Sequence, residues 1–303
     1  MTFSPRAWGL FFAMAGAVGF SGKAILVKLS YRYGVDAVQV IFYRMAFALP
    51  LFLALSWWSG RGQTPLTRRQ WLMVGSLGFS GYYLASMLDF LGLQHISASL
   101  ERLILYLTPT IVVLLTWWRF GRRANGAQWL GMAISYLGVV VVFGHELQVE
   151  GWETAWGGIL VLLSTFSYAY YLMYSGEMIR ELGSMRLVGL ASTVACVLCM
   201  LQLPIVSSVA ALEVPWQVLA LAGVNAVLCT VAPVLLVMLG IERLGAGLAS
   251  QVGMVGPLST ISMGILILGE PFNAWIGAGT LLVIAGVTWA SYRGQTIKVK
   301  AAD

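Results

Sequence analysis

Ten apolar segments follow one another along the 303-residue chain, each close to the length of a helix that crosses a membrane. Such a helix needs about 20 residues to span the hydrocarbon of a bilayer. The segments cover residues 7–28, 37–58, 70–91, 97–118, 127–144, 155–175, 187–207, 215–239, 246–268 and 274–292. Only 10% of all residues are charged, whereas a soluble domain carries about 25%. We therefore expect an all-α integral membrane protein with ten transmembrane helices, because the chain lacks the polar surface that folding in water requires.

The basic residues predict which way these helices run, because cytoplasmic loops of membrane proteins carry an excess of Lys and Arg. With the N-terminus inside, only Lys28, Arg32 and Arg102 fall on the outer side, and the outer loop predicted from His145 to Glu153 has acids but no base. The cytoplasmic set is Arg6, Arg61, Arg68, Arg69, Arg119, Arg122, Arg123, Arg180, Arg186, Arg243, Arg293, Lys298 and Lys300. We therefore expect both termini in the cytoplasm and a multi-pass protein of the cell (inner or plasma) membrane. The net charge of +6 then reflects topology, and no nucleic-acid partner is expected.

The two halves of the chain align without a gap when one is shifted by 148 residues. Many of the coincident residues are Gly or Pro, which define backbone geometry. The matched pairs include Gly92 and Gly240, Pro109 and Pro257, Gly121 and Gly269, Asn125 and Asn273, Gly131 and Gly279, and Gly138 and Gly286. We predict two five-helix repeats, residues 1–147 and 148–303. Because five is an odd number, the repeats enter the membrane in opposite directions, an arrangement typical of secondary transporters.

The same positions make the sequence similar to a known family. They are Ala98-Ser99-Leu100, Pro109, Gly131 and Gly138-Val139 in the first half, and Ala246-Gly247-Leu248, Pro257, Gly269-Glu270-Pro271, Gly279 and Gly286-Val287 in the second. Over nearly the whole chain the sequence resembles the EamA family of the drug/metabolite transporter superfamily. The resemblance implies an alternating-access carrier, often an exporter of amino acids or other metabolites.

One turn departs from the repeat pattern. In the second half Gly269 is followed by Glu270, whereas in the first half Gly121 is followed by Arg122. Because the first half does without the acid, we expect Glu270 to be a capping or interface residue.

Charged residues within the predicted spans are candidates for a functional site, since charge in hydrocarbon is costly and is often retained for function. They are Lys23, Arg44, Asp89 and Glu101. The repeat mates of Lys23 and Arg44 are Tyr171 and Ser192, so the fold itself requires no charge at either position. The alternative is that the charges only neutralise one another as structural ion pairs. Lys28 and Arg102 lie closer to helix ends, and we expect them to extend toward the interface.

Tyrosines share helix faces with these charges. Tyr82 is on the same face of the third segment as Ser86 and Asp89, and Tyr168 and Tyr171 lie on the sixth segment. We hypothesise a central cavity in which Lys23 or Arg44 binds a substrate carboxylate and the tyrosines form an amphipathic wall. Asp89 or Glu101 would bind an amine or carry a coupled proton. The tyrosines are equally compatible with packing and a hydrogen-bonded hydroxyl.

Pro109 and Pro257 fall at matched positions within predicted helices. Each removes a backbone donor, and matched interruptions often mark a binding site or a hinge. We therefore consider both prolines as hinge candidates, with a simple kink as the alternative.

The sequence therefore predicts a secondary transporter, an exporter of a small metabolite such as an amino acid, acting as a monomer or a homodimer. A channel, or a membrane-embedded receptor or subunit without coupled transport, is the alternative. An enzyme is not expected, because His95 and His145 both fall in predicted outer loops and no nucleophile with its base is evident. No cofactor or metal is predicted, since the three cysteines lie in apolar runs and are typical of small buried hydrophobic residues.

Overall fold

The computed structural model describes residues 5–121, 125–206, 212–244, 252–253 and 255–300, and this part of the chain contains helices and no strand. The α-helices are α1 (Pro5–Tyr31), α2 (Ala37–Gly60), α3 (Arg68–Gly78), α4 (Ala85–Leu93), α5 (Ala98–Leu105), α6 (Thr108–Phe120), α7 (Gly126–Glu150), α8 (Trp152–Leu182), α9 (Ser184–Val206), α10 (Trp216–Ala226), α11 (Ala232–Leu244), α13 (Val255–Met263) and α14 (Ala274–Lys300). Three π-helical segments are η1 (Phe79–Leu84), η3 (Val227–Val231) and η4 (Gly264–Leu268). The prediction of an all-α protein is confirmed.

Seven helices in the described part are long and apolar enough to cross a membrane. They are Ala7–Tyr31, Ala37–Gly60, Ala98–Arg119, Gly126–Glu150, Trp152–Leu182, Ser184–Leu203 and Trp216–Val237. Two shorter apolar helices cover Val255–Leu268 and Ala274–Trp289. These helices define a multi-pass membrane protein.

The outer loop predicted from His145 to Glu153 is wrong. Helix α7 continues to Glu150 and α8 begins at Trp152, so Gly151 alone separates them. Gly151 has φ +81°, a backbone conformation that residues with a side chain rarely adopt. It ends α7 by donating its backbone N–H to the carbonyl oxygen of Leu147. The polar residues that suggested a loop therefore lie on helical ends.

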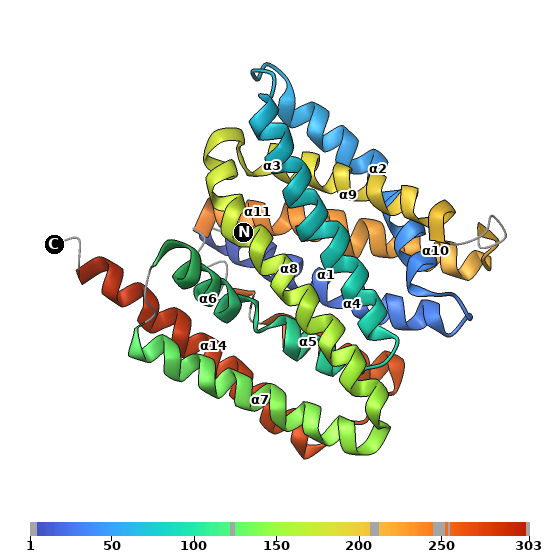
Figure 1. Ribbon diagram of the computed structural model, residues 1–303, viewed down its shortest axis with the longest axis vertical. Helices are drawn as coiled ribbons and strands as arrows, with labels where there is room; N and C mark the ends of the chain where they lie inside the picture. Colours follow the sequence, from blue (N-terminus) through green and yellow to red (C-terminus); the bar gives the residue numbers. More distant parts are fainter. Residues whose placement is uncertain (1–4, 122–124, 207–211, 245–251, 254, 301–303) are drawn as a thin grey trace.

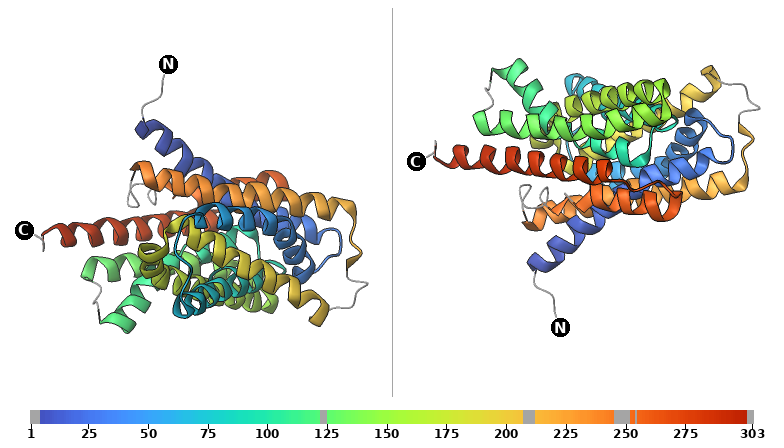
Figure 2. Two further views of the ribbon diagram at one scale, coloured as in Figure 1. Left: turned by 90° about the horizontal axis from the view of Figure 1, so that it is seen from above. Right: turned by 90° about the horizontal axis from the view of Figure 1, so that it is seen from below.

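The helices pair as two related halves would. Helix α7 lies along α14, and α2 along α9 (Figure 1), and the members of each pair are repeat mates under the 148-residue shift. Helix α1 packs against α11, and the shift turns this pair into α8 and α4, which also pack together. The start of α1 and the end of α14 lie on the same side of the bundle in Figure 2.

Local backbone devices also recur at the shift. Asn125 and Asn273 each accept a hydrogen bond from the backbone three residues on, so both begin a helix in the same way. Gly121 and Gly269 each end a helix with positive φ, at 66° and 74°. The π-helices η1 and η3 begin at residues 79 and 227, again 148 apart. The gapless alignment therefore reflects repeated backbone geometry.

The matched glycines let α7 and α14 cross in close contact. A Cβ atom on Gly138 would lie 2.7 Å from the carbonyl oxygen of Gly279, and a Cβ on Gly279 would lie 2.7 Å from that of Gly138. A Cβ on Gly286 would lie 2.5 Å from the carbonyl oxygen of Gly131. Small residues promote this approach between helices in lipid, where burial of apolar surface gives no driving force.

Glu270 caps a helix of the other half. Its carboxylate accepts hydrogen bonds from the backbone N–H groups of Ala98 and Ser99 at 2.7 and 3.2 Å, and from the Ser99 hydroxyl at 2.7 Å. These N–H groups belong to the unpaired first turn of α5, where a negative charge is favourable. The prediction of a capping or interface residue is confirmed, while Arg122, its counterpart, lies outside the described residues.

The sequence predicted that Pro109 and Pro257 interrupt helices from the middle, and the structure places them elsewhere. Helix α5 ends at Leu105 and α6 begins at Thr108, so Pro109 lies in the first turn of α6. Pro257 likewise lies in the first turn of α13, which begins at Val255. Because first-turn N–H groups have no partner within the helix, proline costs little there.

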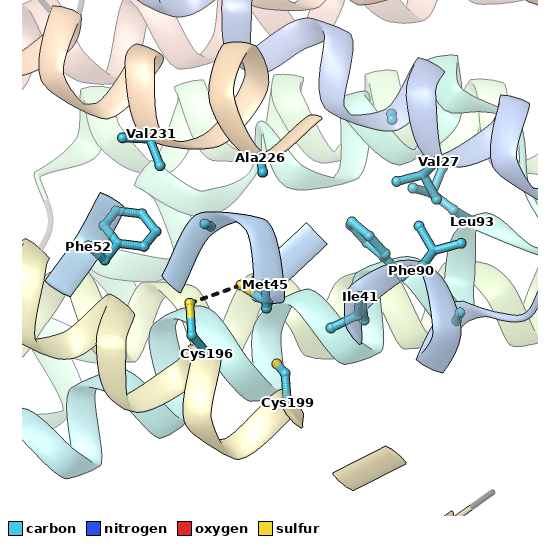
Figure 3. Packing of buried hydrophobic residues seen from close by; sticks show 14 of the residues in the cluster. Val27, Ile41, Met45, Phe52, Phe90, Leu93, Cys196, Cys199, Ala226 and Val231 are labelled. Atoms are coloured by element: carbon cyan, nitrogen blue, oxygen red, sulfur yellow. Dashed lines mark hydrogen bonds between the residues drawn. The ribbon is translucent and has the colours of Figure 1, made fainter. Parts of the chain in front are cut away.

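A buried hydrophobic cluster joins α1, α2, α4, α9 and the α10–α11 region around the site described below (Figure 3). Phe52, Phe90 and Leu93 are among its largest fully buried side chains. All three cysteines are free and buried, and the Cys196 thiol contacts the Met45 sulfur at 3.6 Å. The prediction that they serve as small hydrophobic residues is confirmed.

We expect the substitution Gly286→Ala to destabilise the protein, since the added methyl group would collide with the Gly131 carbonyl. Overpacking of this kind costs about 1–3 kcal/mol, and thermal unfolding of the detergent-purified protein measures it. Gly144→Ala on α7 is the control, because its Cβ meets nothing within 4 Å. Equal melting temperatures for the two variants would contradict the close crossing.

Candidate functional site

Three of the predicted charges meet between α1, α4 and α5. The Lys23 ammonium donates to Oδ2 of Asp89 at 2.5 Å and lies 3.7 Å from Oε1 of Glu101. Asp89 is 2% exposed and Glu101 is fully buried, whereas Lys23 is 18% exposed. The structure therefore brings one cation between two carboxylates that come from separate helices.

The carboxylates of this cluster are incompletely paired. Among the described residues, Oδ1 of Asp89 and both oxygens of Glu101 are buried and receive no hydrogen bond. Buried acceptors without donors are costly, so atoms of this kind call for a physical explanation. Asn225, on α10, supports the cluster from the other half by donating to the backbone carbonyl of Lys23 at 3.3 Å.

Arg44 approaches the same region from α2. Its Nη2 donates to the Ser86 hydroxyl at 3.0 Å, and its guanidinium packs over the Phe90 ring at 4.6 Å from the centroid. The Lys23 ammonium lies 5.8 Å from the centroid of the same ring. Arg44 is 3% exposed, and its Nε has no hydrogen-bond partner in the described part of the chain. Arg44 is thus a buried cation with one hydrogen bond and an aromatic contact, a weaker compensation than Lys23 receives.

The structure places Arg102 differently from the prediction. Its Nη2 donates to the hydroxyl of Ser21 at 3.4 Å, and Ser21 in turn donates to the Gly256 carbonyl at 2.8 Å. A Cβ atom on Gly256 would lie 2.7 Å from the same Nη2. Arg102 therefore turns into the bundle toward α1 and α13. The expectation that it extends to the interface is wrong, because glycine at position 256 leaves room for the guanidinium.

The three candidate tyrosines also meet. The Tyr82 and Tyr171 hydroxyls are 3.3 Å apart and their rings contact edge to face, while Tyr168 stacks on Tyr171 with centroids 5.6 Å apart. A Cβ atom on Gly81 would lie 2.4 Å from Cγ of Tyr171, so this glycine makes room for the ring. Tyr82 lies in η1 and Asp89 in α4, which follows directly. The continuous helical rod formed by α3, η1 and α4 therefore supplies one residue to each cluster.

Polar contacts hold the N-terminal end of α5 and the neighbouring helix ends together. Ser97, the N-cap of α5, donates to Glu146 on α7 at 2.5 Å, and Glu270 binds the first turn as described above. Arg32, just after α1, donates to the Leu268 carbonyl at the end of η4 at 2.7 Å. Glu101 thus lies on a short helix that is fixed at its start by residues of both halves.

The described residues contain no group of three or more His, Cys, Asp or Glu side chains that could hold a metal ion. The assembled side chains can pair charges and can donate and accept hydrogen bonds and protons.

A helical multi-pass membrane protein with related halves and charges inside the bundle belongs to the class of membrane transporters, and comparison with known proteins identifies the family. The EamA-like transporter family model matches residues 7–144 and again residues 155–292. The chain belongs to this family, and its two-repeat architecture agrees with the predicted duplication.

Relatives support the same assignment. The chain is 33% identical to the uncharacterized transporter YcbK of Bacillus subtilis (strain 168), over 95% of this chain and 94% of that protein. It is 23% identical to a probable transport protein of Saccharomyces cerevisiae (strain ATCC 204508 / S288c), over 84% of this chain and 78% of that protein. These names favour transport over catalysis. A solved crystal structure at 16% identity has the same fold, with a TM-score of 0.65 over 95% of this chain and 98% of that chain.

Sequence reasoning missed two contributors to the site. Phe90, an apolar residue on an apolar helix, gave no signal, although both Lys23 and Arg44 pack on its ring. Ser21 was hidden because a serine on a membrane helix is usually a packing residue. A search for polar residues within two positions of each intramembrane charge would have found Ser21, since it precedes Lys23 by two positions, and it contacts Arg102.

We expect Lys23→Met to lower stability strongly, because it leaves the buried Asp89 carboxylate without its ammonium. Loss of one partner of a buried pair costs about 3–5 kcal/mol, and the double variant Lys23→Met/Asp89→Asn should cost less than the sum of the single changes. Thermal unfolding of the purified variants provides the measurement, with the exposed Arg180→Gln as control. Additive effects would indicate that the 2.5 Å contact contributes no coupling.

Proposed function

We propose that this protein is a secondary transporter that exports a small metabolite, such as an amino acid or a related compound, by alternating access. The observation that carries the proposal is a set of buried charges confined to one half of a duplicated scaffold. Structural packing alone would not need them, because the other half has uncharged residues at the matching positions. Inverted repeats of this kind commonly rock around a site near the middle of the membrane.

Arg44 is the better candidate for a substrate carboxylate. Lys23 already donates to Asp89 at 2.5 Å, whereas Arg44 bonds only a neutral hydroxyl among the described residues and keeps a buried Nε without a partner. An arginine fork can bind a carboxylate through two parallel hydrogen bonds. Lys23 then positions the acids and sets the charge of the site.

The remaining candidates have complementary roles. Asp89 or Glu101 binds an amine or a coupled proton, since both have buried acceptor oxygens without donors in the described part of the chain. Tyr82 of η1 forms an amphipathic wall with Tyr168 and Tyr171 of α8. Their rings supply apolar contact and their hydroxyls supply polar contact, a combination suited to a small organic molecule.

The hinges are proposed at helix interruptions. Pro109 follows the break between α5 and α6, and Pro257 lies at the start of α13, at the matching position of the second repeat. The π-helices η1 and η3 add a second matched pair of irregular segments. Such segments often occur at functional positions in membrane helices.

We further propose ten membrane crossings, with residues 1–147 and 148–303 as the repeats and both termini in the cytoplasm. The crossings are the seven long apolar helices, the α3–η1–α4 rod, and the two shorter helices of the second half. The Lys and Arg distribution supports this orientation, which suits an inner or plasma membrane protein. The proposed assembly is a monomer or a homodimer, with lipid around it.

Cysteine labelling tests this orientation. Tyr33 and Gln63 are exposed residues in consecutive loops, and the native cysteines are buried. We expect a membrane-impermeant maleimide to label Tyr33→Cys on intact cells and to label Gln63→Cys only after permeabilisation. The reverse pattern would invert the proposed topology, and equal labelling would remove a crossing between them.

Transport measurements test the function. A thermal-stability screen of the purified protein against amino acids, nucleosides and organic cations selects a compound, and its flux into proteoliposomes is then measured with and without a pH gradient. We expect saturable flux with counterflow. An unsaturable conductance would favour a channel instead.

The neutral variants Lys23→Gln and Arg44→Gln should reduce the flux sharply. A hydrogen bond to a charged group contributes about 1.5–3 kcal/mol, which corresponds to a loss in kcat/KM of roughly 10- to 100-fold. The exposed Arg180→Gln provides the control for expression and reconstitution. Folded Lys23 and Arg44 variants with unchanged flux would refute the proposed site.

A further inference from the structure

Glu101 is a fully buried acid in surroundings that do not suit its ionised form. Neither of its oxygens accepts a hydrogen bond from any described residue. The nearest ammonium, that of Lys23, is 3.7 Å from Oε1 and already donates to Asp89 at 2.5 Å. An ionised carboxylate without donors in a low-dielectric interior is strongly disfavoured, whereas a neutral carboxylic acid needs only one acceptor for its O–H group.

Asp89 offers that acceptor. Its Oδ2 is occupied by Lys23, while its Oδ1 is buried and receives no hydrogen bond within the described part of the chain. Both acids approach the same Lys23 ammonium, Asp89 through Oδ2 at 2.5 Å and Glu101 through Oε1 at 3.7 Å, so the two carboxyl groups are close neighbours. Two ionised carboxylates can only accept, so this contact becomes a hydrogen bond only when one of them holds a proton.

We propose that Glu101 binds an exchangeable proton and donates it to Oδ1 of Asp89, while Lys23 keeps Asp89 ionised. A single proton on Glu101 then provides a hydrogen bond between the Glu101 carboxyl group and Oδ1 of Asp89, which otherwise have no hydrogen-bond partner among the described residues. The assignment of Asp89 as the ionised member follows from its 2.5 Å contact with the ammonium. A role for this proton in driving transport rests on the proposed function. The presence of the proton on Glu101 does not.

The wider surroundings of Glu101 carry both signs of charge. The elements packed around α5 carry several titratable and charged groups, among them Lys23 and Lys28 on α1, Asp89 on α4, Arg102 on α5 itself, Glu146 on α7, and Tyr168 and Tyr171 on α8, and Glu270 binds the start of α5. Arg102 is directed toward Ser21, and Glu146 and Glu270 are bound to Ser97 and to the first turn of α5. Asp89 is therefore the acid that meets Glu101 directly.

Infrared spectroscopy of the protein in lipid membranes tests the proposal. A protonated carboxylic acid has a C=O stretching band that an ionised carboxylate lacks. We expect the wild-type protein to show this band at neutral pH and to lose it on titration to alkaline pH. The variant Glu101→Gln should lose the Glu101 component of this band, and the matched variant Glu146→Gln, which removes another buried glutamate of the same region, should retain that component.

Asp89→Asn provides an independent variant if Glu101→Gln does not fold, as judged by thermal unfolding and gel filtration. Without Asp89, Glu101 becomes the counterion of Lys23 and should ionise, so the band should be lost at neutral pH. A band that is unchanged in Glu101→Gln or in Asp89→Asn, that disappears entirely in Glu146→Gln, or that is absent from the wild type overturns the proton site.

The infrared test of the Glu101 proton and the test of the proposed transport function can fail independently. Counterflow of the compound selected by the stability screen, measured at equal pH on both sides of the membrane, tests the carrier without reference to Glu101. Failure of counterflow with an intact Glu101 band would refute the carrier and leave the proton site. Counterflow without the band would refute the proton site and leave the carrier.

Discussion

The contact between the Lys23 ammonium and the carboxylates of Asp89 and Glu101 constrains the rest of the structure. A single charge at the centre of a membrane helix costs about 2.5–3.5 kcal/mol on insertion scales, and this cluster brings three ionisable side chains into the bundle. None of the helices that supply them can be stable in lipid with its charge exposed. Helices α1, α4 and α5 must therefore be held together, and the fold provides this through Glu270 and Glu146 at the start of α5 and the apolar cluster around Phe90.

The scaffold that holds the charges is itself nearly free of charge. Close backbone contact through Gly131, Gly138, Gly279 and Gly286 joins α7 to α14, neither of which carries Lys23, Asp89 or Glu101. In lipid such contacts replace the hydrophobic effect as the cause of helix association. Packing and chemistry are thus separated, because the symmetric contacts determine where the helices lie and, in the proposed function, the charged side chains determine what the interior binds.

The scaffold could be predicted from the sequence far better than the site. Apolar length and the recurrence of Gly and Pro are local or periodic signals, so the helices, the repeats and the role of Glu270 followed from them. The contacts of the site depend on side-chain direction in three dimensions. Lys23 was identified from the sequence, but its hydrogen bond to Asp89 was not. Arg102 was assigned to the interface because the sequence shows that it is near a helix end, whereas the space beside Gly256 is seen only in the structure. The first-turn placement of Pro109 also required the observed break before α6.

The residues that contact one another in the first half differ from their counterparts in the second half as two groups. At the positions that match Lys23, Asp89 and Glu101, the second half has Tyr171, Val237 and Ala249, so the cation is absent together with both acids. At the positions that match Arg44, Ser86 and Phe90 it has Ser192, Val234 and Met238, so the guanidinium is absent together with its hydroxyl and its ring. Tyr171 needs only one hydrogen-bond partner, and Tyr82 provides it. Interacting residues thus differ between the repeats as groups, as the proposed site requires, and this is not expected of isolated charges that the scaffold merely tolerates.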